Sequence, residues 1–154
     1  MKKLLTGAVL TVLSAAPLQA ASVLDPYLGN PGDCYTRKYD EAHLRDHPRQ
    51  MVEIFSLAHH DSYQDPQGEL TLKFGFTTRN GRDYEGIAIC KGNACRVEGD
   101  GGAFTLKPSN DALRLDVNAK RGMAAEGSFD FVELSETDDT VFLLYPAARG
   151  QCIQ

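Results

Sequence analysis

Apolar side chains alternate with polar or small ones along most of this chain, and that spacing constrains the fold more than any other feature. It is clearest at positions 70–77, where leucine or phenylalanine occupies every second place. Successive side chains of a strand face opposite sides, so this pattern predicts a strand with one buried face. Asn80-Gly81 follows closely and is a strong signal for a tight hairpin turn. We therefore expect a fold made mainly of antiparallel β-structure.

The same alternation, with turn residues between the segments, predicts about eight strands in a single domain over residues 21–154. The strands are expected at 51–57, 70–77, 83–90, 95–98, 103–107, 113–117, 129–134 and 141–145. Sequential hairpins favour an antiparallel meander that forms a small barrel or sandwich. Residues 22–37 are rich in proline, glycine and asparagine and are expected to be irregular. One short N-terminal helix is expected at 40–47, between an N-cap at Asp40 and a stop at Pro48.

Residues 1–20 have the three parts of a cleavable secretory signal peptide. Two lysines come first, a short apolar run follows over 4–13, and small residues precede an expected cut after Ala20 or Ala21. The apolar run is shorter than the roughly 20 residues that a membrane-spanning helix needs. We therefore expect export to the periplasm or to the outside of the cell, and no stable membrane insertion after cleavage.

All four cysteines, Cys34, Cys90, Cys95 and Cys152, lie beyond that cut. An even number in an exported chain indicates two disulfides, and three pairings are open. We favour Cys90–Cys95 across a hairpin loop and Cys34–Cys152 between the two ends of the domain. The alternative is four thiols or a zinc site, for which the paired C-x-x-C spacing is missing.

The charge of the chain excludes one class of partner. The formal net charge is −5, and removing residues 1–20 takes away two lysines and no acid, which makes it −7. A nucleic-acid partner needs clustered lysine and arginine, so this acidic balance argues against one. The same balance is compatible with a basic protein partner.

The histidines suggest a metal site. His43 and His47 are four residues apart on the expected helix, which places both on one face. A third ligand is expected from His59, His60 or Asp61, and neutral imidazole suits zinc or copper. The simpler interpretation is that His43 and His47 are solvated residues of a helix, and no other cofactor is indicated.

Signals for catalysis are weaker. The sequence His59-His60-Asp61 contains a base and a carboxylate, but no nucleophile motif surrounds Ser56 or Ser62. A hydrolase with paired carboxylates stays open, because acids are frequent at the expected turns and strand ends. They include Glu98, Asp100, Glu133, Glu136, Asp138 and Asp139. Their default role is that of solvated turn charges, and Gly101-Gly102 is expected to form a turn or bulge.

Two motifs resemble those of a group of short exported bacterial proteins that have no assigned activity. They are Cys34-Tyr35-x-x-x-Tyr39-Asp40-x-Ala42-His43-Leu44-x-x-His47-Pro48-x-Gln50 and Gly101-Gly102-x-Phe104. The resemblance implies periplasmic export and a β-rich fold, and carries no function. In size and export the chain is also similar to periplasmic inhibitors of C-type lysozyme, which are small disulfide-bonded β-barrels. The Ser-Gly-x-x-Tyr type loop of that family is absent, so no inhibitory residue is carried over.

The leading interpretation is a non-catalytic periplasmic domain that binds a protein or a small ligand through a barrel mouth or an exposed loop. The alternatives are a histidine-based metal-binding protein and a hydrolase with paired carboxylates. The state of the barrel interior separates the ligand classes, because a hollow interior favours a small ligand and a filled one favours a protein bound at the loops.

The export signal makes a direct prediction about the mature chain. Mass spectrometry of the protein purified from the cells that make it is expected to find Ala21 or Ser22 as the first residue. A double variant with Lys2→Glu and Lys3→Glu, which removes the positive start of the signal, is expected to accumulate uncut. A wild-type chain that still carries Met1 would contradict the prediction of export.

Overall fold

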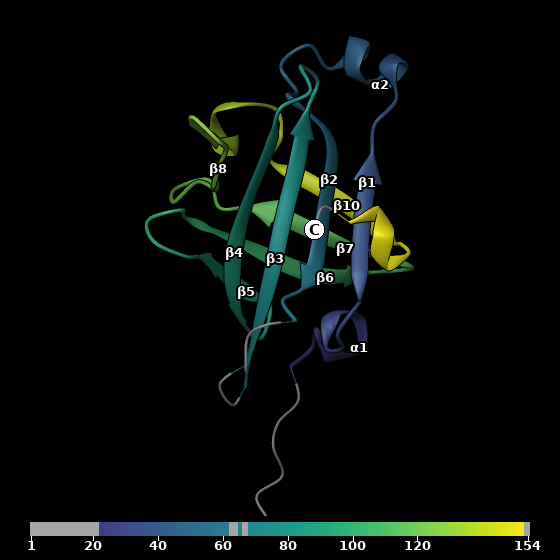
Figure 1. Ribbon diagram of the computed structural model, residues 1–154, viewed down its shortest axis with the longest axis vertical. Coiled ribbons are helices and arrows are strands. Elements are labelled where there is room, and N and C mark those ends of the chain that lie inside the picture. Colours follow the sequence, from purple (N-terminus) through teal and green to yellow (C-terminus); the bar gives the residue numbers. More distant parts are fainter. Residues whose placement is uncertain (1–21, 62–64, 66–67, 153–154) are drawn as a thin grey trace, which may run out of the picture.

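The computed structural model describes residues 22–61, 65 and 68–152, and in them the chain forms a closed antiparallel β-barrel (Figure 1). The ring of strands consists of β1 (Cys34–Lys38), β2 (Val52–His59), β3 (Glu69–Thr78), β4 (Asp83–Lys91), β5 (Ala94–Val97), β6 (Ala103–Ser109), β7 (Ala112–Val117) and β10 (Val141–Pro146). Each of these strands pairs with the next one along the ring, and β10 closes the ring by pairing with β1. The predicted meander is therefore confirmed, and it takes the form of a barrel.

Two further strands form a side hairpin that branches from the barrel. They are β8 (Ala124–Glu126) and β9 (Phe131–Glu133), which pair with each other. The hairpin joins the barrel at β4 through the pair Glu85–Glu126, and β9 is the last strand of the sheet. This hairpin therefore stands outside the ring, as Figure 1 shows for β8.

The predictions for two segments, 22–37 and 129–134, were wrong. The barrel includes β1, whose first four residues belong to the segment 22–37 that was expected to be irregular. Its sequence does not alternate, and pairing with β2 and β10 makes it a strand. Residues 129–134 are not a barrel strand: Phe131–Glu133 belong to the side hairpin, and Leu134 begins the 3-10 helix η1 (Leu134–Glu136).

Two short helices lie at opposite ends of the barrel (Figure 1). The expected one is α2 (Glu41–Asp46), where the Asp40 carboxylate accepts a hydrogen bond from the His43 backbone N–H at 2.8 Å. The second, α1 (Asp25–Leu28), was not predicted, and it buries Leu24 and Leu28 completely. Across the described ranges no helix has the length and apolar character needed to cross a membrane.

Aromatic side chains fill the interior of the barrel. Phe55, Phe74, Phe76, Phe104 and Phe142 are each at most 1% exposed. The Phe55 ring packs 4.4 Å from the Phe142 ring and 6.0 Å from the Phe76 ring, measured between centroids. A barrel of about eight strands is narrow enough for side chains to occupy its interior. The packing therefore corresponds to a filled core.

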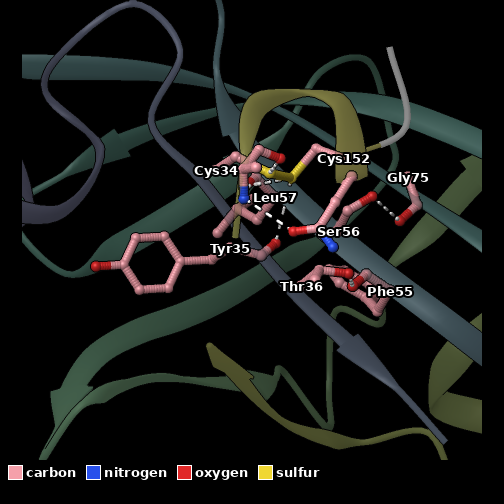
Figure 2. The surroundings of a disulfide bond; sticks show 10 residues. Cys34, Tyr35, Thr36, Phe55, Ser56, Leu57, Gly75 and Cys152 are labelled. Carbon is pink, nitrogen blue, oxygen red and sulfur yellow. Dashed lines mark hydrogen bonds between the residues drawn. A yellow bond between two sulfur atoms is a disulfide. The ribbon is translucent and has the colours of Figure 1, made fainter. Parts of the chain in front are cut away.

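Both cysteine pairs lie at disulfide distance in the expected pairing. Cys90 and Cys95 face each other in register across the β4–β5 hairpin. Cys34 at the start of β1 is bonded to Cys152, which follows the 3-10 helix η2 (Arg149–Gln151). Figure 2 shows Cys152 above β1 and β2, with its sulfur 3.6 Å from the carbonyl oxygens of Tyr35 and Leu57. Cys152 is thereby bonded to β1 and lies against β2.

Gly102 connects the barrel to the side hairpin at very short range. Its φ of +89° lies in the left-handed region, and a Cβ at this position would overlap the carbonyl oxygens of Arg121 and Gly122. The neighbouring Ala103 N–H donates to the Gly122 carbonyl at 2.9 Å. This is the close backbone approach that the paired glycines at 101–102 allow.

Gly102→Ala is expected to lower the free energy of unfolding by roughly 2–5 kcal/mol, because backbone strain and steric overlap add together. Gly92→Ala is the matched control: Gly92 also has a positive φ, of +61°, but nothing lies within 4 Å of a Cβ there. The free energy of unfolding of this control variant should fall by only about 1–2 kcal/mol. Urea unfolding of both variants measures the difference, and equal losses would contradict the proposed overlap.

Candidate functional site

A groove of about 930 Å³ opens where β4 changes its neighbour in the sheet. Residues 88–91 of β4 pair with β5, whereas the first half of β4 meets β8 only at the pair Glu85–Glu126. Gly86 and Ile87 lie between these two pairings and line the groove. The groove therefore results from a split in the sheet.

The two walls of the groove are tied to each other by backbone hydrogen bonds. One wall is the turn 98–101 between β5 and β6, and the other is β8 with the residues that follow it. The Ala124 N–H donates to the Gly101 carbonyl at 2.9 Å, and Gly102 bridges to Met123. These bonds hold the width of the groove in the folded protein.

Acidic side chains dominate the groove. They are Asp83, Glu85, Glu98, Asp100 and Glu126, and all five are exposed to solvent. The basic lining residues are His60 and Lys73, and the Lys73 ammonium lies 3.0 Å from the Glu85 carboxylate. Glu98 and Asp100 were named from the sequence, whereas the other three acids were not, because they belong to strands rather than to turns.

The side hairpin carries two exposed phenylalanines. Phe129 is fully exposed (102%) and Phe131, which also lines the groove, is 71% exposed. The tip of the hairpin is closed by a hydrogen bond from the Gly127 N–H to the Asp130 carbonyl at 2.7 Å. Asp130 also accepts a hydrogen bond from Arg82 at 2.9 Å. The spacing of the two phenylalanines predicted a strand over 129–134, although Gly127, Ser128 and Asp130 around Phe129 are turn residues that could have indicated a tip.

Glu133 holds the base of this hairpin. Its Oε1 accepts hydrogen bonds from the Met123 N–H at 2.8 Å, the Ser135 N–H at 2.9 Å and the Ser135 hydroxyl at 2.8 Å. Partial burial raises the pKa of Glu133, but these hydrogen bonds outweigh it and leave the pKa below the usual value. Glu133 is therefore a structural carboxylate and not a free turn charge.

Asp139 is a second structural acid, and the expectation that it is solvated was wrong. Its side chain is 2% exposed and accepts hydrogen bonds from the backbone N–H groups of Met51 and Val52 and from the Thr137 hydroxyl. Burial raises the pKa of Asp139 more than the hydrogen bonds lower it. The carboxylate connects the start of β2 to the segment before β10.

The histidines do not come together as expected. His43 and His47 belong to the α2 end of the barrel, and His59 ends β2 at the α1 end, where its Nδ1 lies 3.0 Å from the Leu28 carbonyl oxygen. His60 and Asp61 follow His59 directly. A third metal ligand from 59–61 would therefore lie at the opposite end of the barrel from His43 and His47. Among the residues with described positions, no group of three or more His, Cys, Asp or Glu side chains is arranged to hold a metal ion.

His43 and His47 are neighbours, but their rings are stacked. The ring centroids are 4.4 Å apart with an angle of 29° between the planes, and Tyr39 stacks on the other side of His43. Nε2 of His43 lies 2.9 Å from Oε1 of Gln50. Because imidazole lone pairs lie in the ring plane, two stacked rings direct them side by side and not at one ion. Joint coordination would require one ring to turn.

A second cleft, of about 440 Å³, lies beside the Cys34–Cys152 disulfide and includes His59 and His60. Asp61 forms an ion pair with Arg149 in this cleft. The Ser56 hydroxyl is 2% exposed and is directed at the Gly75 carbonyl (Figure 2). Ser62 lies outside the described residues. The arrangement assigns Asp61 a structural partner and leaves Ser56 inaccessible as a nucleophile.

Comparisons with protein-family models, with curated proteins and with solved structures found no match for this chain. The class defined by the structure is a closed antiparallel β-barrel of eight strands with a side hairpin. Function must therefore be argued from the hairpin and the groove themselves.

The role of Glu133 predicts a pH-dependent stability. A carboxyl whose pKa is lower in the folded than in the unfolded chain stabilises the fold above its unfolded pKa, and this is lost as the pH falls through the folded pKa. Glu133→Gln keeps an acceptor oxygen but removes the charge, so it should lower the free energy of unfolding at pH 7 by roughly 1 kcal/mol. The deficit should shrink in urea unfolding toward pH 3, whereas the exposed neighbour Glu136→Gln should show no such trend. A deficit that is independent of pH would contradict the role of the charge.

Proposed function

We propose that this chain is an exported, non-catalytic domain that binds a protein partner through the β8–β9 hairpin. The observation that carries the proposal is the full exposure of Phe129 at the tip of a hairpin outside the barrel ring. The folded hairpin keeps a large apolar side chain in water. Its burial by a partner would lower the free energy and favour binding. Aromatic residues of this kind are frequent energetic anchors of protein interfaces.

The filled core supports a protein partner over a small ligand. Phenylalanines occupy the interior of the barrel, so binding falls to the outer loops and grooves. A rigid, disulfide-bonded frame that projects one aromatic tip suits insertion into a partner's cleft, which is how an inhibitor acts. The periplasm is the compartment we propose, in agreement with the signal peptide and the two disulfides.

A hydrolase with paired carboxylates is less well supported. Glu85 and Glu126 do stand opposite each other in the groove. Both are exposed, however, and Glu85 is in an ion pair with Lys73. A general acid that works near neutral pH usually needs apolar surroundings, which raise the pKa of a carboxyl. Glu85 and Glu126 are two exposed charges, and they lack the apolar surroundings that a general acid needs.

Site-specific photo-crosslinking tests the proposal in the cells that make the protein. A chain with photoreactive benzoylphenylalanine in place of Phe129 is expected to form one discrete adduct with another protein. The control carries the same group in place of Lys107, an exposed residue of β6, and should not form that adduct. No adduct at position 129, or the same adducts at both positions, would overturn the proposal. Because Phe129 is fully exposed, the fold of the crosslinking variant should match that of the wild type by circular dichroism.

A further inference from the structure

We infer that the groove beside the hairpin binds an extended segment of the partner that carries lysine or arginine. This inference rests on the proposed function and adds the chemistry of the partner. It combines three features of the groove: its shape, the sign of its charge and its apolar lining.

The groove lies between two walls that are fixed in the folded protein. The groove runs between the turn 98–101 and β8, and its volume is about 930 Å³. Its walls are joined through Gly101 and Gly102, and Glu133 holds the base of β8 and β9. A groove that is already ordered loses little conformational entropy on binding, so more of the contact energy is available for affinity.

The charge of the groove selects a cation. Five carboxylates line it, against Lys73, which is engaged with Glu85, and His60. Glu85 and Glu126 are directly opposite in the antiparallel ladder, a placement in which like charges repel. Of the cations at described positions, none forms an ion pair with Glu126 or Asp100. A lysine or arginine head placed between Glu85 and Glu126 would reduce the repulsion and give Glu126 an ion-pair partner beside the Lys73–Glu85 pair.

The apolar lining distinguishes a basic polypeptide from a bare cation. Ile87, Val97 and Phe131 line the same groove as the acids. Phe131 pairs in register with Glu126, so its ring stands next to that carboxylate. Lysine and arginine side chains have long apolar stems that pack on such surfaces, and their heads attract the face of an aromatic ring. A segment with spaced cations can therefore use both the acids and the lining.

Fluorescence anisotropy of the intact protein with a labelled peptide tests this inference. The probe is an octapeptide of alternating lysine and glycine with blocked ends, in 0.15 M NaCl. Saturable binding is expected, and a double variant with Asp100→Asn and Glu126→Gln should weaken it at least fivefold. The matched control, with Glu41→Gln and Asp111→Asn, removes the same charge from exposed positions that do not line the groove and should weaken binding less than twofold. Absence of binding below millimolar concentration, or equal weakening in both variants, would overturn the inference.

A second measurement locates the peptide. In the ¹⁵N-labelled protein, the amide signals of Gly86, Ile87, Gly99 and Gly127 are expected to shift with the added peptide, and shifts confined to other faces of the barrel would overturn the inference. Mg²⁺, a bare cation, should bind more weakly than the peptide, because it has no apolar stem; equal affinity would refute the role of the apolar lining. The crosslink at position 129 does not depend on the groove acids. A crosslink without peptide binding therefore removes only this inference, whereas a missing crosslink removes the proposed function.

Discussion

The barrel closes where β1 meets β10, and only Tyr35–Pro146 and Thr36–Tyr145 are in register at that junction. Every other pair of adjacent strands in the ring has at least three residues in register. The Cys34–Cys152 bond lies at this weakest junction and joins the start of β1 to the chain beyond β10. The two cysteines are 118 residues apart in sequence. In the chain-entropy model a cross-link over that distance raises the free energy of the unfolded state by about 5 kcal/mol. The bond therefore reinforces the junction at which the ring closes around its core.

Closure also decides where binding can occur. In the described residues each strand of the closed ring has a neighbour on both sides, and phenylalanines fill the core. The free edge of the sheet is instead β9, in the side hairpin, beside the acidic groove. The features that we connect with function therefore lie where the side hairpin branches from the ring.

Local patterns predicted the barrel strands that alternate and the helix that is capped. The strand at 70–77 was found because its apolar residues alternate, and the strand at 83–90 was found because it follows the Asn80-Gly81 turn. The helix α2 was found because Asp40 caps it and Pro48 follows it. β1 was missed because its partners and not its own side chains make it a strand. The opposite error was made at Phe129 and Phe131, where apolar residues at strand spacing are exposed.

The candidate site was only partly visible in the sequence. Glu98 and Asp100 were noted as turn acids, but their proximity to Glu126 results from the return of the chain at β8. The histidines show the reverse case: His43 and His59 are close in sequence, yet β2 runs the length of the barrel between them. Asp139 was interpreted as a surface charge because Asp138-Asp139 was expected to form a turn, whereas two of its hydrogen-bond donors, Met51 and Val52, lie at the start of β2, far away in sequence.

The sequence by itself determined the β-rich class and the order of the hairpins, because these depend on residues that are neighbours along the chain. Only the tertiary structure decided which strand closes the ring, which phenylalanines stay in water and which acids share a groove. Those outcomes depend on pairings between residues far apart in sequence. The free energy of each such pairing depends on the partner and the burial that folding supplies, neither of which can be read from a single segment.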